Sequence, residues 1–159
     1  IIFKTQDNNI TDNIKRLIRI TRDEIQFMNG KININKKKII RQKVKNSESI
    51  RCGSFLLKTE TFLETLPNGI QHLASYNMVG TLQNTPKYKV PSGHYFLMGD
   101  NRDCSKDSRF LGTVGYVNKL NLVGEAKVIF FSNDTNKGRL LKFWNLKNSF
   151  RIERTFQGL

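Results

Sequence analysis

Along most of this chain, apolar and polar residues alternate over short segments, which is the pattern of strands with one buried face. Nowhere do apolar residues keep the spacing of a helix for more than about a dozen residues. The pattern therefore predicts a single β domain spanning residues 1–159, with a mainly antiparallel sheet.

The strongest local signal is a hairpin over residues 23–35. Asn29 and Gly30 stand at its centre, and an Asn-Gly pair readily adopts the positive φ angles of a tight type I′ turn. We predict that this extended hairpin projects from the domain. Its alternating apolar positions are Ile25 and Phe27 on one arm and Ile32 and Ile34 on the other.

Weaker alternation predicts further strands, and turn residues mark where they end. Pro67, Asn68 and Gly69 form a turn triplet that divides residues 55–74 into a strand pair. The other predicted strands cover residues 13–20, 95–98, 122–132 and 149–156, and residues 86–91 read as a connector.

A basic segment interrupts the pattern within residues 31–54. Residues 31–51 contain eight Lys and Arg side chains and one acid, Glu48, while residues 36–54 have few large apolar side chains. We interpret residues 31–54 as a basic insertion or solvated loop within the domain.

The whole chain is also basic, with 27 Lys and Arg against 13 Asp and Glu and a net charge of +14. Such a charge attracts polyanions, either nucleic acid or anionic lipid headgroups. Single-strand nucleic-acid sites interleave cations with aromatic rings, but no aromatic residue lies between Asn29 and Phe55. We therefore do not expect nucleic acid as a partner, and an anionic membrane surface stays open.

No apolar run approaches the roughly 18–20 residues that a membrane-spanning helix needs, and the densest run is residues 128–131. The first twenty residues are too rich in charge for a signal peptide. We expect any membrane anchor of the protein to lie outside this sequence.

Cysteine and histidine are sparse. Cys52 and Cys104 do not make a disulfide scaffold, and a zinc site needs about four closely spaced ligands. His72 and His94 are isolated in the sequence, and we expect them to face solvent or to be hydrogen-bonded. We predict no metal and no cofactor, and the cysteines do not settle the redox compartment.

The densest group of ionisable residues is Gly99–Arg109, which reads Gly-Asp-Asn-Arg-Asp-Cys-Ser-Lys-Asp-Ser-Arg. Apolar residues flank it on both sides, at 95–98 and 110–111. Its acids and bases alternate at short range, so Asp–Arg bonds can lock a buried turn. On the residues alone, an ordinary structural polar loop remains an alternative.

The segment from Val90 to Ser132 resembles the C-terminal signature of type I signal peptidases. That signature continues with Gly112-Thr113-Val114 and Gly124-Glu125-Ala126 in this sequence. A weaker resemblance covers residues 13–24, where Ile14, Lys15, Arg16 and Asp23 fit the family pattern.

The weaker motif also departs from the family. Arg19 and Arg22 replace two glycines, and Thr21 replaces a proline. Gly and Pro set a tight turn that Arg and Thr set poorly. The resemblance as a whole extends from Ile2 to Phe156.

The resemblance implies a Ser/Lys dyad, in which a lysine without its proton activates a serine to attack the scissile carbonyl. Lys15 matches the general base, and Ser105 matches the serine that orients its amine. Asp107 and Arg109 match a supporting ion pair. Asp100 and Arg102 belong to the same braced turn, Gly99 allows a close approach, and Ile14 helps to line the pocket for small substrate side chains.

The nucleophilic serine of the family lies in a Ser-x-Met-x-Pro motif, which is absent from these 159 residues. We therefore expect the isolated chain to be inactive, as a piece of a longer protein, a truncated reading frame or a decayed copy. Two further hypotheses are a non-catalytic remnant and a basic module that binds a polyanion or membrane surface.

The resemblance also implies a substrate and a place in the cell. The substrates would be the signal peptides of preproteins with Ala-x-Ala sites. The full-length family works at the bacterial inner membrane, with its catalytic domain on the periplasmic or outer side.

Overall fold

The computed structural model describes residues 1–5, 12–19, 22–77, 82–129 and 157–158. The chain divides into two compact units, Ile1–Val123 and Gly124–Leu159. The expected single domain over residues 1–159 stays a prediction, and the alternation expected at 149–156 lies outside the described residues.

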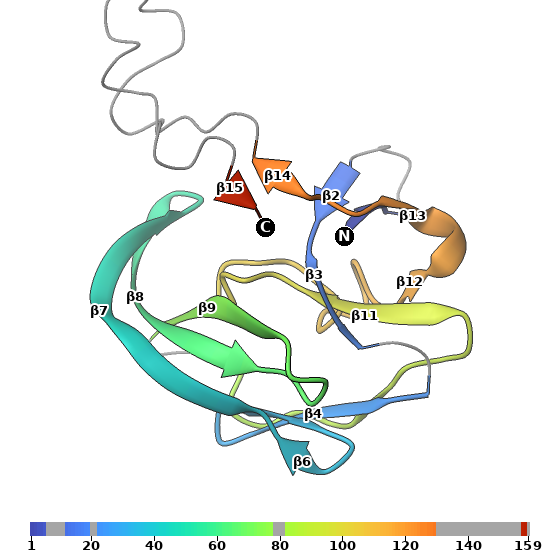
Figure 1. Cartoon of the computed structure of the whole chain (residues 1–159), viewed down its shortest axis with the longest axis horizontal. Helices are drawn as coiled ribbons and strands as arrows, with labels where there is room; N and C mark the ends of the chain where they lie inside the picture. The colour runs from blue at the N-terminus through green and yellow to red at the C-terminus, as the bar shows by residue number, and fades with distance from the viewer. Residues whose placement is uncertain (6–11, 20–21, 78–81, 130–156, 159) are drawn as a thin grey trace, which may run out of the picture. The chain divides into compact units, whose positions relative to one another are not determined.

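Nearly all regular structure in the described residues is strand (Figure 1). The only helix among them is the short 3₁₀ turn η1 (Lys119–Asn121). The strands are β1 (Ile2–Lys4), β2 (Asp12–Ile14), β3 (Arg16–Arg19), β4 (Glu24–Met28), β5 (Lys31–Ile34), β6 (Lys37–Lys38), β7 (Ile40–Cys52), β8 (Phe55–Thr65), β9 (Gln71–Asn77), β10 (Tyr88–Lys89), β11 (His94–Met98), β12 (Val117–Asn118), β13 (Leu122–Gly124), β14 (Val128–Ile129) and β15 (Gln157–Gly158).

These strands form small sheets in the orders β13-β1-β2, β10-β4-β5-β6, β12-β11-β3 and β7-β8-β9. The strand pairs with a defined register are antiparallel. In the second unit, β14 pairs with β15, also antiparallel. The predicted mainly β, antiparallel fold is confirmed.

Strand β11 has both faces buried. Phe96 and Met98 enter a large apolar cluster with the β4–β5 hairpin, while Leu97 enters a smaller one with Phe3 and Val117. Strand β3 pairs with β11, and it divides Ile18 and Leu17 between the same two clusters. The antiparallel register places the start of β3 beside the end of β11, since Arg16 lies opposite Met98.

The hairpin predicted over residues 23–35 is confirmed as β4–β5. Asn29 and Gly30 have φ angles of 50° and 67°, as a type I′ turn requires. Its expected projection from the domain is wrong, because all four alternating apolar side chains are buried in the larger cluster. The turn is held as well, with the Gly30 amide donating to the Gln83 carbonyl at 2.8 Å.

The extended hairpin is instead β7–β8, whose strands have 13 and 11 residues and curve together in Figure 1. The interpretation of residues 31–54 as a loop is therefore wrong, because β5, β6 and β7 occupy most of them. Many side chains of β7 are exposed, so this strand has no regular apolar face. The predicted pair around residues 67–69 is confirmed as β8 and β9.

Gly30→Ala should lower the free energy of unfolding by about 1 kcal/mol, since a side chain is strained at positive φ. A Cβ at this position would also lie 3.3 Å from Gln83 Oε1. Gly112→Ala is the control, because its Cβ would meet no atom within 4 Å and its φ is ordinary. Denaturant unfolding measures both, and equal midpoints would contradict the assignment of the turn.

Candidate functional site

Lys15 lies between β2 and β3, immediately before the residue that faces the end of β11. Its backbone amide donates to the Ile1 carbonyl at 3.0 Å, which continues the β1–β2 ladder. The Lys15 side chain is half-buried, whereas the neighbouring Ile14 is 61% exposed. This placement leaves Ile14 accessible to a ligand beside the lysine.

Arg16 ties the start of β3 to the signature loop Gly99–Arg109. Its guanidinium donates from Nε to Asp100 Oδ1 at 2.6 Å and from Nη2 to Asp100 Oδ2 at 2.8 Å. Both side chains are partly exposed, so this two-point pair fixes geometry more than it adds stability. Asp100 thus braces the signature loop from β3, whereas Arg102 points to other partners.

The Ser105 side chain occupies the space that a side chain at position 99 would need. A Cβ on Gly99 would lie 1.8 Å from Ser105 Oγ, so a side chain there would displace the serine. Gly99 follows Met98, the residue opposite Arg16, so Ser105 is held at the end of the β3–β11 pair where Lys15 lies. The described residues include no hydrogen bond between Lys15 Nζ and Ser105 Oγ. Direct contact between these two side chains therefore stays a prediction.

The structure contains the Asp107–Arg109 ion pair that the resemblance implies. Arg109 Nε and Nη2 each lie 2.7 Å from an oxygen of the Asp107 carboxylate, and both side chains are buried. Asp107 Oδ2 also accepts from the Gly99 amide at 2.9 Å. The pair therefore fixes the backbone on which Ser105 rests.

Arg102 is fully buried and points toward the β8–β9 strands. Its guanidinium lies 2.7 Å from Glu64 Oε2 and donates to the Tyr76 hydroxyl, also at 2.7 Å. Tyr76 donates in turn to Glu64 Oε1, and His72 Nε2 lies 3.1 Å from the Glu64 carboxylate. Arg102 Nε also donates to the Gly99 carbonyl at 3.1 Å, so this network supports the same glycine.

The sequence did not indicate Glu64, His72 or Tyr76 as part of the site. The expectation that His72 is hydrogen-bonded holds, but it is buried rather than facing solvent. Alternation along β9 was a usable signal, because His72 and Tyr76 share its buried face with Ala74. No local pattern pairs Glu64 with Arg102, which lies 38 positions further along the chain.

The network shifts the acidity of its members. Burial alone would raise the pKa of Glu64, but the His72 hydrogen bond, the Arg102 charge and the Tyr76 hydrogen bond lower it to about 2. Burial raises the pKa of the Tyr76 hydroxyl against the opposing charge of Arg102. Glu64 is therefore ionised over the whole neutral range and balances the buried guanidinium.

The two cysteines form a disulfide bond, which the sequence did not predict. Cys52 ends β7 and Cys104 lies within the signature loop, and their Cα atoms are 5.6 Å apart. The bond joins residues separated by 52 positions. Cross-links of this kind typically stabilise a fold by about 2–4 kcal/mol.

Arg22 has a φ angle of 71°, in the left-handed region that favours glycine. This is the position of a glycine in the family motif. The Arg22 amide donates to the Val90 carbonyl at 2.9 Å, which ties this turn to the strand region after β10. Thr21 lies outside the described residues, as does the backbone between it and β3.

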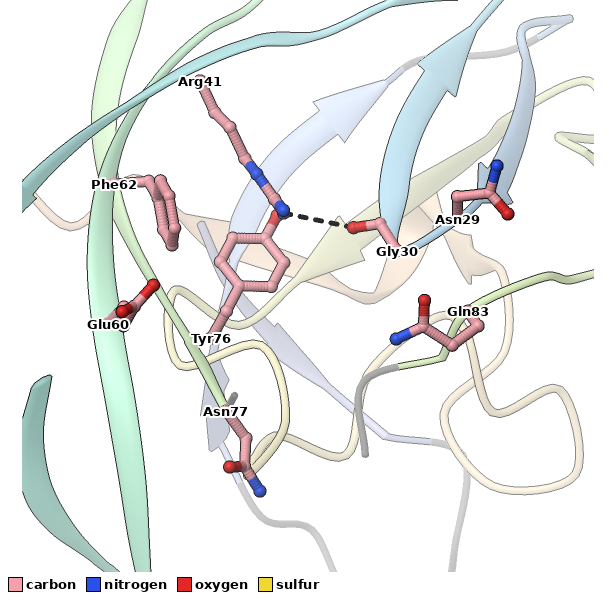
Figure 2. Close-up of a pocket in the computed structure, with 8 residues that line it drawn as sticks. All are labelled: Asn29, Gly30, Arg41, Glu60, Phe62, Tyr76, Asn77 and Gln83. Atoms are coloured by element: carbon pink, nitrogen blue, oxygen red, sulfur yellow. Dashed lines mark hydrogen bonds between the residues drawn. The ribbon is translucent and has the colours of Figure 1, made fainter. Parts of the chain in front are cut away.

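A separate cavity of about 260 Å³ lies between the two hairpins. Arg41 crosses it, with its guanidinium 4.7 Å and 4.6 Å from the ring centres of Phe62 and Tyr76 (Figure 2). Arg41 Nη1 donates to the Gly30 carbonyl at 3.1 Å, so part of the basic segment is packed on aromatic rings. The lining residues are Asn29, Gly30, Arg41, Glu60, Phe62, Tyr76, Asn77 and Gln83.

Within the described part of the chain, no group of three His, Cys, Asp or Glu side chains is placed to hold a metal ion. The same residues include no helix of the length and apolar character that crossing a membrane would take.

Known proteins are similar in sequence to most or all of this chain. The sequence model of the family described as "Signal peptidase, peptidase S26" matches residues 1–131. Signal peptidase I of Rickettsia typhi is 35% identical over 175 residues, which cover 100% of this chain and 64% of that protein. Signal peptidase I of Rickettsia bellii (strain OSU 85-389) is 36% identical over 179 residues, with coverages of 100% and 58%.

The chain thus spans less than two thirds of the length of these curated relatives. Among solved structures, it is similar to the crystal structure of a signal peptidase I from Enterococcus faecalis. That likeness has a TM-score of 0.43 and 21% sequence identity, and it covers 79% of this chain and 91% of the other.

Glu64→Gln should lower the free energy of unfolding at pH 7 by about 3 kcal/mol, because it leaves the buried Arg102 charge without its counterion. The pKa of Glu64 falls on folding from near 4.5 to about 2. Its contribution, about 3 kcal/mol, is therefore complete above pH 4.5 and lost as pH falls toward 2.

Denaturant unfolding at a series of pH values measures this effect. The difference between the native chain and Glu64→Gln should shrink as pH falls from about 4.5 to about 2. Glu60→Gln is the control, since Glu60 pairs with the exposed Lys43. Its substitution should change the free energy of unfolding by less than about 1 kcal/mol. A difference that stays constant over this range would contradict the assigned role of Glu64.

Proposed function

Because this chain belongs to the signal peptidase family, peptidase S26, we propose that it is the base-bearing part of a type I signal peptidase. The full protein would be a serine endopeptidase that removes signal peptides from secreted preproteins. The observation that supports this most strongly is the Arg16–Asp100 pair, which joins the residue after Lys15 to the signature loop at one end of the β3–β11 pair.

In the proposed mechanism, Lys15 is the general base. A serine hydroxyl attacks the scissile carbonyl and passes its proton to Lys15 Nζ, which then gives it to the leaving amine. Ser105 holds the amine in place. Asp107 and Arg109 fix the backbone at Gly99, while Asp100 and Arg102 brace the loop from two sides.

The nucleophile is the part of this mechanism that the 159 residues do not contain. None of their three methionines has a serine two positions before it, so no Ser-x-Met-x-Pro motif is present. Ser105 is a poor substitute, since its proposed task is to hold the lysine. We propose that these residues alone do not cleave a preprotein, and that they contribute the base to a serine supplied by another segment.

The proposed substrates are signal peptides with an Ala-x-Ala cleavage site. The exposed Ile14 beside Lys15 is suited to contact the small side chains of such a site. A bulky substrate residue would compete with Ile14 for the space beside the base.

The proposed working place is the outer side of the bacterial inner membrane. The Cys52–Cys104 disulfide supports it, because such bonds persist in oxidising compartments and are rare in the cytosol.

An anionic membrane surface is the second proposed partner, through the turn of the β7–β8 hairpin. Phe55 and Leu56 are 72% and 69% exposed there. Arg51 and Lys58 are also exposed beside them. Apolar side chains between cations are suited to enter the headgroup region of an anionic bilayer. Nucleic acid offers no comparable use for the apolar pair.

The test of cleavage compares the chain alone with the same chain joined behind a membrane anchor and a Ser-x-Met-x-Pro segment. Each is incubated with a detergent-solubilised preprotein that carries an Ala-x-Ala site. We expect mature product from the joined protein only, and Lys15→Ala should slow its formation by about 10²–10⁴-fold.

Lys119→Ala is the matched control, because Lys119 is exposed on η1 and has no proposed role in the reaction. It should cleave at the normal rate. Cleavage by the chain alone that is lost in Lys15→Ala would show that the nucleophile lies within these residues. Full activity of the joined Lys15→Ala protein would exclude Lys15 as the base. A joined protein that folds but never cleaves would favour a non-catalytic remnant.

The membrane contact is tested by sedimentation of the chain with lipid vesicles. It should bind vesicles rich in phosphatidylglycerol, more weakly at high salt, and hardly bind pure phosphatidylcholine. The double variant Phe55→Ser, Leu56→Ser should bind at least about tenfold more weakly. Leu120→Ser is the control, since Leu120 is 82% exposed elsewhere. Equal losses in both variants would contradict a specific role of the hairpin turn.

A further inference from the structure

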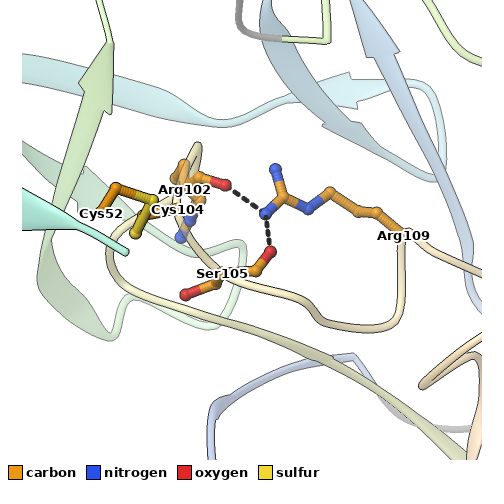
Figure 3. The surroundings of a disulfide bond; sticks show 5 residues. All are labelled: Cys52, Arg102, Cys104, Ser105 and Arg109. Carbon is orange, nitrogen blue, oxygen red and sulfur yellow. Dashed lines mark hydrogen bonds between the residues drawn. A yellow bond between two sulfur atoms is a disulfide. The ribbon is translucent and has the colours of Figure 1, made fainter. Parts of the chain in front are cut away.

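The disulfide joins the turn of the extended hairpin to the signature loop, next to the residue proposed to orient the base. Cys52 is the last residue of β7, and Cys104 directly precedes Ser105 (Figure 3). The hairpin residues beyond Cys52, Gly53 and Ser54, are exposed at the turn. The bond therefore connects an exposed part of the protein directly to the candidate site.

The rest of the signature loop is held by other contacts. Asp100 pairs with Arg16, Arg102 is buried against Glu64, and Asp103 accepts a hydrogen bond from the Asn77 amide at 2.5 Å. After these come Cys104, Ser105 and Lys106. The disulfide is the covalent restraint on this stretch, and the side chain of Lys106 is exposed.

Ser105 needs an exact placement because it lies against the backbone of Gly99, where no side chain would fit. Its amide donates to the Asn101 carbonyl at 3.1 Å, which closes a turn around Cys104. On the other side, Arg109 Nη2 donates to the Arg102 carbonyl and, at 3.5 Å, to the Ser105 carbonyl. This last contact is long, so it restrains Ser105 weakly.

We propose that Cys52 and Cys104 are positioning residues for Ser105, so that the site is fully assembled only when their disulfide is formed. The inference rests on the proposed function through the role given to Ser105. Both cysteines are half-buried, so a small thiol can reach the bond. A dithiol reductant would be oxidised to its own disulfide, and each cysteine sulfur would gain a hydrogen.

The consequence is an enzyme that gains its full rate after it reaches an oxidising compartment. In the reduced chain the ion pairs of Arg102 and Arg109 remain, so the fold is expected to persist. The stretch around Ser105 gains freedom, and loss of orientation around a catalytic base lowers the rate of the chemical step more than substrate binding.

The experiment uses the joined protein from the cleavage test, before and after treatment with a dithiol reductant. The chain has only two cysteines, so reductant can act on no other disulfide within it. We expect reduction to lower kcat by about 10- to 100-fold with little change in KM. The double variant Cys52→Ser, Cys104→Ser should match the reduced protein and be insensitive to reductant.

Ser105→Ala is the decisive variant. If the disulfide acts through Ser105, this variant is already slow and reduction slows it hardly further, because the two changes remove the same interaction. If reduction lowers kcat by the same factor in Ser105→Ala as in the native sequence, the disulfide acts independently of Ser105 and the proposal is overturned. A purely structural bond would give that additive result.

A second measurement needs no catalysis. Hydrogen exchange of the 159-residue chain should speed up on reduction at the Ser105 amide, while the Gly99 amide, held by Asp107, stays protected. Unchanged exchange at Ser105 would overturn the proposal even if the joined protein proved inactive. Faster exchange together with an inactive oxidised protein would uphold the positioning of Ser105 and refute the proposed function alone.

Discussion

Two buried guanidinium groups, Arg102 and Arg109, set the main constraint on this structure. A buried charge without a partner costs several kcal/mol, so each must be matched by an acid in place. Asp107 lies two positions from Arg109 and serves it locally. Arg102 needs Glu64, which belongs to β8, so the closed signature loop depends on the β8–β9 strands packed against it. Stability and the geometry of the candidate site therefore depend on the same contacts.

The strand that precedes the signature loop holds the start of that loop in place. Strand β11 has apolar side chains in two clusters, so it cannot slide or rotate without exposing one of them. Gly99 follows directly, and its amide and carbonyl are both bonded to ionic side chains, Asp107 and Arg102. The backbone under Ser105 is thus held by the core on one side and by buried ion pairs on the other.

How well the sequence predicted a feature depends on how far apart along the chain the interacting residues lie. The β4–β5 hairpin was predictable because Asn29 and Gly30 determine the turn and the apolar residues alternate. Strand β7 was not, because much of it is exposed and its basic residues show no apolar period. The resemblance indicated the Asp107–Arg109 pair, whereas Glu64 and the disulfide join residues 38 and 52 positions apart, for which local pattern has no signal.

The β7–β8 hairpin is therefore a structural element that supports the signature loop, whereas its charge suggested a solvated insertion. One element carries the exposed Phe55 and Leu56 at its turn, the disulfide partner Cys52 beside them, and the counterion Glu64 at its base. Anything that binds the turn is thus connected to the signature loop at Cys104 and Arg102. Arg41, one of its basic residues, packs this hairpin against the β4–β5 turn.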